Sequence, residues 1–418
     1  MRCRLMPVIV LAWCVSGVRA ENWPQFRGPT GQGISSERGL PAQWNATEGV
    51  RWKAAVPGSG WWSPIVWGRR VFLTTTTDAG ASCRVLCFSA DDGGLLWNRE
   101  VFRQQPGQRH GRNSYATPTP ATDGRRVYAV FWDGSVAAVN FDGTVAWINR
   151  DHPHHSEHGL SSSPILVGDL LVMARDGSSE GPDRSVGWQT PWDKAALLAL
   201  DKNSGKVRWI GRRGMSRIAH AVPVAWTDEK GVTQIVSVAG DVVQGFDPRT
   251  GERLWSSRNT CEGLVPSPAV GGGMVFTASG FGGAEATRAY RLGGTGDLEE
   301  TNLVWSQQRG TPKVPSLLYV APYVYTVSDT SLAVCLEAAT GKIMWEQRLG
   351  GSFSASPVYA DGRIYFLSDQ GDTTVVEAGP TFKQIAKNPL GERCQASPAI
   401  SGGRIFIRTE SSLFCIGK

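Results

Sequence analysis

The stretch Asp201-Lys202-Asn203-Ser204-Gly205-Lys206-Val207-Arg208-Trp209 decides the fold, because its pattern returns along the chain. Asp247 to Trp255 repeats it, and Ala338 to Trp345 (Ala-Ala-Thr-Gly-Lys-Ile-Met-Trp) is a third copy. Glycine takes the positive φ of a tight hairpin turn, and Asp, Asn or Thr side chains bond back to the turn backbone. A tryptophan lies near the end of six such units: Trp97, Trp147, Trp209, Trp255, Trp305 and Trp345.

A second mark opens each unit, a small residue followed by proline at the start of an apolar strand. Eight starts result, 41 to 59 residues apart: Ser63-Pro64, Thr117-Pro118, Ser163-Pro164, Val222-Pro223, Ser267-Pro268, the degenerate Pro315-Ser316, Ser356-Pro357 and Ser397-Pro398. Between the two marks lie a glycine hairpin, an alternating strand such as 127–130, and a third strand such as 196–200. Four antiparallel strands in about 45 residues are typical of one propeller blade. We therefore predict an all-β, eight-bladed β-propeller with four-stranded antiparallel blades.

The ends of the repeat predict how the ring closes. The eighth unit, Cys394 to Lys418, has three strands and no tryptophan strand, whereas Val50 to Val56 has no unit of its own. We expect this N-terminal strand to complete the last blade, which pairs an otherwise open sheet edge. In the seventh unit Phe382 stands near the tryptophan position, so that blade contact is expected to be looser.

These repeats resemble the tryptophan-docking propellers of the quinoprotein alcohol dehydrogenase superfamily, the PQQ-like repeat proteins. The opening Asn22-Trp23-Pro24-Gln25-Phe26-Arg27-Gly28-Pro29 also resembles the mature N-terminus of planctomycete-type members. The resemblance implies that each tryptophan packs between adjacent blades. It also implies kinship in fold with the lipoprotein propeller of outer-membrane barrel assembly, which is a scaffold.

The N-terminus has the features of an export signal. Arg2 and Arg4 precede an apolar run from Leu5 to Val15, and Val18-Arg19-Ala20 offers small residues for cleavage before Glu21. We expect a signal peptide at 1–20, an N-terminal extension at 21–49 and the propeller at 50–418, in a periplasmic or secreted protein. Cysteine 14 follows an imperfect lipobox, so a lipoprotein is the alternative. We expect no transmembrane segment.

Charge and cysteine usage limit the classes of partner. The formal net charge of +6 falls to +3 without Arg2, Arg4 and Arg19, and no basic cluster indicates a nucleic-acid partner. Cys87, Cys335 and Cys415 fall at one repeat position, where another unit has Ala199, so we expect buried and mostly free thiols. We expect a monomer that binds an envelope protein or a small polar ligand.

The long loops 103–114, 151–159 and 174–194 all lie on one face, where function is expected. Residues at the entry of each first strand should surround the channel mouth there, with Arg112, His158 and Arg217 slightly further out, and together they could bind a polar or anionic ligand. The candidates are Trp62, Arg112, Tyr115, His158, Arg217, His220, Lys313 and Gln395. The alternative is a solvated rim without a ligand.

One loop holds a histidine cluster, which raises a metal site as a weaker hypothesis. Its candidate ligands are His152, His154, His155 and His158. Imidazole is a common transition-metal ligand, but these residues lack a second ligand pair at a fixed spacing.

The resemblance implies a PQQ and calcium hypothesis, which the residues do not support. PQQ dehydrogenases of the superfamily use adjacent cysteines, and no two cysteines are adjacent here. We expect no cofactor and no catalytic residues. The leading prediction is a non-catalytic propeller that acts as a protein- or ligand-binding scaffold in the cell envelope. The alternative is a periplasmic quinoprotein-like oxidoreductase or a sugar-binding enzyme that uses the channel mouth.

Overall fold

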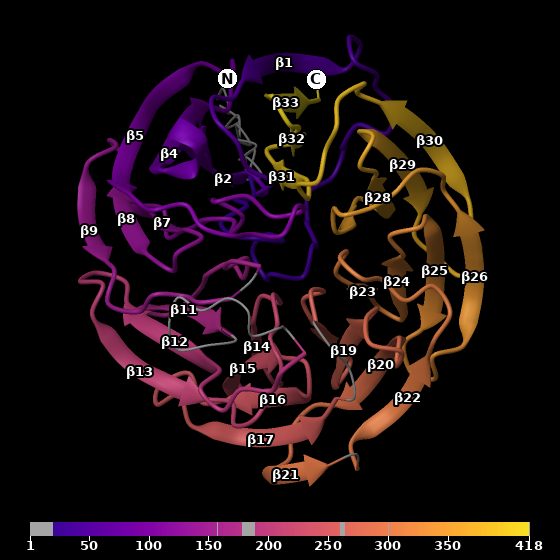
Figure 1. Cartoon of the computed structure of the whole chain (residues 1–418). Coiled ribbons are helices and arrows are strands. Elements are labelled where there is room, and N and C mark those ends of the chain that lie inside the picture. Colours follow the sequence, from indigo (N-terminus) through magenta and orange to yellow (C-terminus); the bar gives the residue numbers. More distant parts are fainter. Residues whose placement is uncertain (1–19, 157, 178–188, 260–263, 300, 418) are drawn as a thin grey trace, which may run out of the picture.

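The computed structural model describes residues 20–156, 158–177, 189–259, 264–299 and 301–417. The expected signal peptide lies almost entirely outside these residues. Eight antiparallel sheets stand around a central channel, as predicted (Figure 1). The one helical element of the described residues is the short 3-10 helix η1 (Asp78–Gly80), so the fold is all-β.

Blades 1 to 4 follow the chain order from the channel outward. Blade 1 contains β2 (Ile65–Trp67), β3 (Arg70–Thr77), β4 (Ser82–Ser89) and β5 (Leu95–Arg103). Blade 2 contains β6 (Ala121–Thr122), β7 (Arg126–Val130), β8 (Val136–Asn140) and β9 (Val145–Asn149). Blade 3 contains β10 (Ile165–Val167), β11 (Leu170–Arg175), β12 (Ala196–Asp201) and β13 (Val207–Arg212). Blade 4 contains β14 (Val224–Thr227), β15 (Thr233–Val238), β16 (Val242–Phe246) and β17 (Arg253–Arg258), with β21 (Gly296–Glu299) added outside.

Blades 5 to 8 continue the ring. Blade 5 contains β18 (Ala269–Gly271), β19 (Met274–Ser279), β20 (Ala286–Arg291) and β22 (Leu303–Gln307). Blade 6 contains β23 (Leu318–Val320), β24 (Tyr323–Val327), β25 (Leu332–Glu337) and β26 (Ile343–Arg348). Blade 7 contains β27 (Val358–Ala360), β28 (Arg363–Leu367), β29 (Asp372–Glu377) and β30 (Gln384–Pro389). Blade 8 contains β31 (Ala399–Ser401), β32 (Arg404–Arg408), β33 (Ser412–Ile416) and, outermost, β1 (Val50–Ala55).

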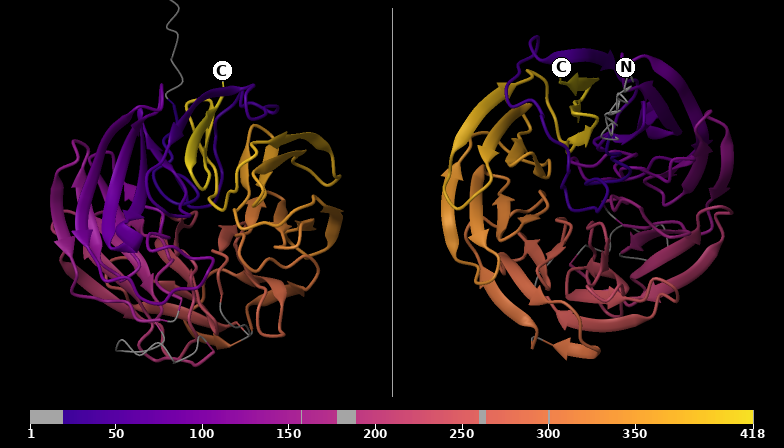
Figure 2. Two further views of the ribbon diagram at one scale, coloured as in Figure 1. Left: turned by 45° about the horizontal axis from the view of Figure 1, so that its top comes forward. Right: turned by 180° about the vertical axis from the view of Figure 1, so that it is seen from behind.

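Strand β1 closes the ring as predicted from the unmatched N-terminal segment. It pairs antiparallel with β33, with Trp52 opposite Cys415 and Ala55 opposite Ser412. The first strands of neighbouring blades contact one another around the channel, which places them innermost. The ends of the described chain therefore meet in one blade (Figure 2).

The repeated tryptophans connect consecutive blades. Six of them donate their indole N–H to a backbone carbonyl of the next blade, at 2.8–3.0 Å: Trp52, Trp97, Trp147, Trp209, Trp305 and Trp345. The turn glycine beneath is required sterically as well as by its backbone angle. A Cβ at Gly205, whose φ is +72°, would lie 2.5 Å from the ring of Trp147. Each ring thus fits against the turn of its neighbour.

Trp255 behaves differently from these six. It is fully buried, but its indole N–H donates to Gln234 Oε1 of its own blade at 2.8 Å. The following blade carries an insertion whose strand β21 pairs in parallel with β17, Gly296 lying opposite Trp255. One blade edge of this propeller is therefore extended by a fifth strand taken from the next blade.

The blade 7 contact corrects the expectation about Phe382. The position opposite Val375, which corresponds to the tryptophan position of other blades, is occupied by Ala386. Phe382 lies before β30 and packs against Trp345 of blade 6, with ring centroids 5.2 Å apart. Blade 7 receives Trp44 of the N-terminal extension instead. Trp44 is buried and stacks on Tyr365, and its backbone N–H donates to Asn388 Oδ1 at 3.0 Å.

The cysteines follow the sequence prediction. Cys87, Cys335 and Cys415 each lie directly opposite a tryptophan on the neighbouring strand, as Ala199 does. The five cysteines within the described residues are buried and unbridged. Burial raises the pKa of Cys335 to about 12, so this thiol is protonated and unreactive at neutral pH.

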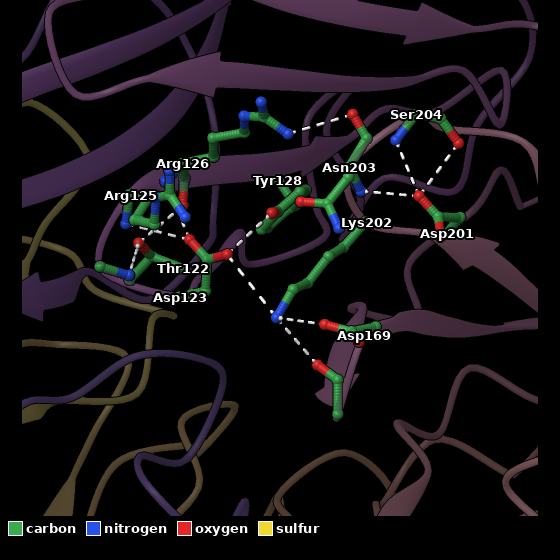
Figure 3. Close-up of polar contacts among 12 residues, drawn as sticks. Thr122, Asp123, Arg125, Arg126, Tyr128, Asp169, Asp201, Lys202, Asn203 and Ser204 are labelled. Atoms are coloured by element: carbon green, nitrogen blue, oxygen red, sulfur yellow. Dashed lines mark hydrogen bonds and ion pairs between the residues drawn. The ribbon is translucent and has the colours of Figure 1, made fainter.

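The hairpin turns on one face are tied together across blades (Figure 3). The carboxylate of Asp123 accepts the backbone N–H groups of Arg125 and Arg126 and lies 3.9 Å from Lys202 Nζ of blade 3. Burial alone would raise the pKa of Asp123, but these N–H donors hold it below its usual value. Asp201 accepts the backbone N–H of Ser204 at 2.9 Å, which is the predicted turn chemistry.

Residues 22–35 form a stopper segment at one end of the channel. Trp23 pairs with Val66 of blade 1, the carbonyl of Pro24 accepts the N–H of Thr122 of blade 2, and Ile34 bridges Tyr359 of blade 7. The Arg27 guanidinium, 1% exposed, donates to the carbonyl of Leu317 just before β23. Figure 1 shows this indigo segment reaching the centre of the ring. The extension therefore closes the channel, whereas β1, which follows it, completes blade 8.

Candidate functional site

Two residues from the entry of each first strand face the channel. Side chains of extended backbone alternate in direction, so the residue before the strand-opening proline and the residue two earlier point the same way. The eight pairs are Trp61 and Ser63, Thr117 and Thr119, Ser161 and Ser163, His220 and Val222, Val265 and Ser267, Val314 and Ser316, Ser354 and Ser356, and Gln395 and Ser397. They line a cavity of about 580 Å³.

The deeper residue of most pairs belongs to a hydroxyl ring. In six cases its hydroxyl accepts a backbone N–H of the preceding blade at 2.9–3.1 Å: Thr119, Ser163, Ser267, Ser316, Ser356 and Ser397. Blade 2 corrects the sequence register, because Thr119-Pro120 rather than Thr117-Pro118 occupies this position. The ring is interrupted at Val222, which has no hydroxyl. The serine of the repeat thus links neighbouring blades.

The floor of the cavity is Phe26 of the stopper segment. The segment bonds to first-strand residues three positions beyond the hydroxyl ring, such as Val66 and Thr122. It therefore crosses the channel beneath the ring, and access is from the opposite, loop-rich face.

A lid loop, residues 104–113, covers part of the mouth. It connects blade 1 to blade 2, and its Arg112 reaches across to Asp329 of blade 6, with Nη1 and Oδ1 3.1 Å apart. Asn113 Nδ2 donates to the carbonyl of His158 at 2.8 Å. His110, Arg112 and Asn113 of this loop all line the cavity.

Five of the eight predicted site residues line the cavity: Arg112, His158, His220, Lys313 and Gln395. Three do not. Trp62 is buried inside the fold, where its ring occupies the space that a Cβ at Gly60 would need, and its neighbour Trp61 faces the cavity instead. The sequence prediction was one residue off at this position.

The two other predicted residues support the loops. Tyr115 donates its hydroxyl to the carbonyl of Gly107 at 3.0 Å and packs edge-on against Trp132, which holds the lid loop in place. Arg217 pairs with Asp241, its Nε and Oδ1 3.0 Å apart, and does not line the cavity.

The histidines are arranged differently from the predicted cluster. His152 and His154 take part in backbone hydrogen bonds that hold the loop. The backbone carbonyl of His152, for example, accepts a hydrogen bond from Arg175 Nη2 at 2.6 Å. His158 faces the cavity and meets His110 and His220, with ring centroids 5.5 and 5.6 Å apart. Within the described ranges, no group of three or more His, Cys, Asp or Glu side chains is arranged to hold a metal ion, the predicted four included.

His220 lies against Ser161, with Nδ1 and Oγ 2.7 Å apart. Burial, and then the nearby rings of His158 and His110, lower the pKa of His220 to about 3. Its imidazole is therefore neutral at physiological pH. A base this weak is poorly matched to activating the Ser161 hydroxyl.

Carboxylates near the mouth accept hydrogen bonds from backbone N–H groups of the strand entries. Asp329 accepts the backbone N–H of Lys313 at 2.7 Å and that of Val314 at 3.3 Å, in addition to pairing with Arg112. Asp241 accepts the N–H of Arg217 at 2.8 Å. These carboxylates therefore hold in place the backbone that leads into the first strands of their blades. Among the described residues that line the cavity, none carries a carboxylate.

Sequence reasoning missed most of the lining, including the hydroxyl ring, Ser161 and Phe26. The hydroxyl ring could have been found, because the repeated serine and the residue two earlier must share a side of an extended strand. Ser161 follows from the same rule. Phe26 could not, because nothing in the repeat specifies where an extension outside it will run.

Comparisons with known proteins address the fold and the family. The family model described as outer membrane protein assembly factor BamB matches residues 45–226 and 296–411. Tetrathionate hydrolase of Acidithiobacillus ferrooxidans is 23% identical over 190 residues, which are 42% of this chain. The chain spans 38% of the length of that relative.

Solved structures share the architecture at low identity. A europium-containing methanol dehydrogenase superposes with a TM-score of 0.66 at 10% identity, covering 95% of this chain and 98% of the other. BamB from Moraxella catarrhalis gives 0.56 at 13% identity, covering 83% and 98%. These likenesses concern the fold alone. In the part of the chain that the structure describes, no helix has the length and apolarity needed to cross a membrane.

Proposed function

Because the chain belongs to the family described as outer membrane protein assembly factor BamB, we propose that it is an exported, non-catalytic scaffold that binds a protein partner in the cell envelope. Within that family the printed description is of an assembly factor, and this supports a role in binding other proteins. The export signal expected from the sequence and the family both support an envelope location.

The proposal rests on the outermost strands of blades 1 to 3, whose exposed apolar side chains we call the outer-edge surface. Six large apolar side chains are 37–52% exposed on three consecutive outermost strands: Leu95 and Leu96 on β5, Val145 and Ile148 on β9, and Val207 and Ile210 on β13. Exposed apolar groups gathered on one side of a protein are typical of a binding surface. Outer strands of blades 5 to 7 present no such group among the described residues.

The same edges have backbone groups open to pairing. Each of β5, β9 and β13 pairs on its inner side only, within the described residues. Blade 4 supports strand addition as the binding mode, because its edge strand β17 already takes up β21. An extended segment of a partner would bond to such an edge through its main chain and place alternate side chains over the apolar residues.

Site-specific photocrosslinking tests this function. A photoreactive residue at position 148 or 210 should give one discrete protein adduct in intact envelopes, whereas the same residue at Gln347 on the exposed edge of blade 6 should give none. In a second arm, Ile148→Asp combined with Ile210→Asp should abolish that adduct, and Gln347→Asp should not. Equal adducts from both edges, or none from either, would overturn the proposal.

The cavity lining does not support the quinoprotein alternative. A quinone bound through calcium or a lanthanide needs oxygen ligands for the metal, above all carboxylates. The described cavity lining has none, and no adjacent cysteines occur in the sequence. The residues present do not fit the group.

Thermal unfolding with PQQ and calcium provides the check on non-catalytic function. We expect no change in Tm with PQQ, calcium or both. Specific binding at about 100 times Kd would add about 2.7 kcal/mol of stability. A saturable rise that needs both components would therefore contradict a non-catalytic role and favour oxidoreductase assays on alcohols and sugars.

A further inference from the structure

We infer that the stoppered cavity is a binding site for a small hydroxylated organic acid, held without a metal ion. This site is separate from the outer-edge surface, and its test is independent of the scaffold proposal. The inference is carried by the enclosure of the cavity and by the chemistry of its lining.

Enclosure gives the cavity the form of a small-molecule site. Its volume of about 580 Å³ lies within the usual range of roughly 300–1,000 Å³ for such sites. Phe26 closes the floor, and the lid loop covers part of the mouth through the Arg112 contact with Asp329. A channel serving only as the hollow axis of the ring would need neither a floor nor a lid.

The hydroxyl ring supplies donors. Each of its six hydroxyl oxygens already accepts a backbone N–H, so its own hydrogen remains to be donated. Within the described chain, none of these six donates that hydrogen to a protein acceptor. The ring, interrupted at Val222, therefore offers O–H donors above the floor, and its complement is a ligand rich in oxygen acceptors.

Charge at the mouth favours an acid over a neutral acceptor. Arg112 and Lys313 line the cavity, whereas their acidic partners Asp329 and Glu285 stand outside the lining. A ligand carboxylate would thus meet a guanidinium and an ammonium without facing a carboxylate of the protein. The aromatic rings of Phe26, Trp61 and Phe281 provide apolar walls for a carbon skeleton. Such walls favour an organic acid over an inorganic anion.

Isothermal titration with D-glucuronate, D-gluconate and L-malate is the experiment. We expect saturable one-to-one binding of at least one of these hydroxy acids in the presence of EDTA. D-Glucose, which has the ring of glucuronate without the carboxylate, should bind at least tenfold more weakly. Sodium sulfate at equal ionic strength should not displace the acid.

Matched variants locate the site. Lys313→Gln should weaken binding of the acid about three- to tenfold, because a charged hydrogen-bond donor is lost, whereas Lys342→Gln on the hairpin face should leave it unchanged. Ser356→Ala should weaken binding by a similar factor. Ser356→Thr should retain it, since Thr119 shows that threonine fits the ring.

Three results would overturn the inference. They are no saturable heat with any of the three acids, equal affinity for glucose and glucuronate, and displacement by sulfate. Binding that disappears in EDTA would do the same, because it would make a metal ion part of the site. None of these results depends on whether the outer-edge surface binds a protein.

Discussion

Asp176 and Arg213 form an ion pair whose two side chains are completely buried. Arg213 Nε lies 2.6 Å from Asp176 Oδ1, and Arg213 Nη2 donates to Ser237 Oγ of blade 4 at 2.8 Å. Burial raises the pKa of Asp176 against the opposing effect of the guanidinium. Both residues lie in blade 3, and the bond from Arg213 to Ser237 links the pair to blade 4, at the junction where Val222 interrupts the hydroxyl ring. Arg213 thus joins the two blades from within a buried charge pair.

Removing the charge of one partner of this ion pair should lower the free energy of unfolding. In Asp176→Asn the buried guanidinium loses its counter-charge, and we expect unfolding free energy to fall by about 3–5 kcal/mol in urea denaturation. Asp247→Asn is the control, because its partner Arg249 is 85% exposed and such pairs contribute about 0–1 kcal/mol. Similar losses in the two variants would contradict a special role for the buried pair.

His220 predicts a loss of stability in acid. The pKa of His220 is about 3 in the folded protein and 6.5 in an unfolded chain. Below pH 6.5 the unfolded chain therefore binds a proton at this residue that the folded protein does not bind. Stability from this group is complete above pH 6.5 and falls as pH drops towards 3, by at most about 1.4 kcal/mol per pH unit.

Replacing His220 separates its contribution to the pH dependence of stability from that of the other groups. His220→Gln should show a shallower decline of unfolding free energy between pH 7 and pH 4 than the wild type. Gln395→Asn, a change in the same cavity without a titrating group, should keep the wild-type slope. An unchanged slope in His220→Gln would mean that the imidazole is protonated in the folded protein.

At the level of the elements, the N-terminal extension supplies blade 7 with the tryptophan that the outermost strand supplies in other blades. Phe72, Tyr128, Phe276 and Tyr325 each lie about 6 Å from the tryptophan of their own blade. Tyr365 of blade 7 has Trp44 at 6.3 Å instead. A segment outside the repeat thus fills the one tryptophan position that the repeat leaves to alanine.

Trp44→Ala should therefore behave as a core substitution. We expect a loss of about 3–5 kcal/mol, the usual cost of truncating a buried tryptophan, measured by urea unfolding. Trp61→Ala, in the cavity wall, should cost far less. A loss below about 1 kcal/mol for Trp44→Ala would show that the extension is dispensable to blade 7.

The strands themselves could be predicted because the repeat contains them. Turn glycines, the strand-opening proline and the tryptophan recur, so an error in one copy is corrected by the others. The register of blade 2 was misplaced because Thr117-Pro118 and Thr119-Pro120 both satisfy the pattern, and only the hydrogen bonds to Ser63 and Ser163 decide between them. Trp44 and the stopper segment occur once, so no repeat could place them.

On the scale of the whole molecule, most of the candidate site depends on which residues of distant blades converge. Sequence placed His220, Lys313 and Gln395 at the mouth because they stand at the entries of first strands, and it placed Arg112 and His158 slightly further out on the same face. It could not show that Arg112 crosses to Asp329, or that Phe26 lies below them. Those contacts join segments with no shared pattern.

Ring closure gives a prediction at this scale. Deleting residues 50–56 removes β1 and exposes the edge of β33, so we expect loss of the cooperative unfolding transition and rapid proteolysis of blade 8. Deleting residues 22–29 removes none of the strands of the described chain, β1 included, and should lower Tm with the transition still cooperative. Equal tolerance of the two deletions would refute closure by β1.

The pairing of β1 with β33 also bears on how quickly the native state is reached. During synthesis β1 emerges long before its partner strand β33, so the ladder between them joins residues that are far apart in the sequence. Contacts of such large sequence separation form slowly, because loop-closure entropy must be overcome before they contribute. An unclosed ring exposes strand edges that invite aggregation in the meantime. We therefore expect refolding to end in a slow step, in which the circle is completed.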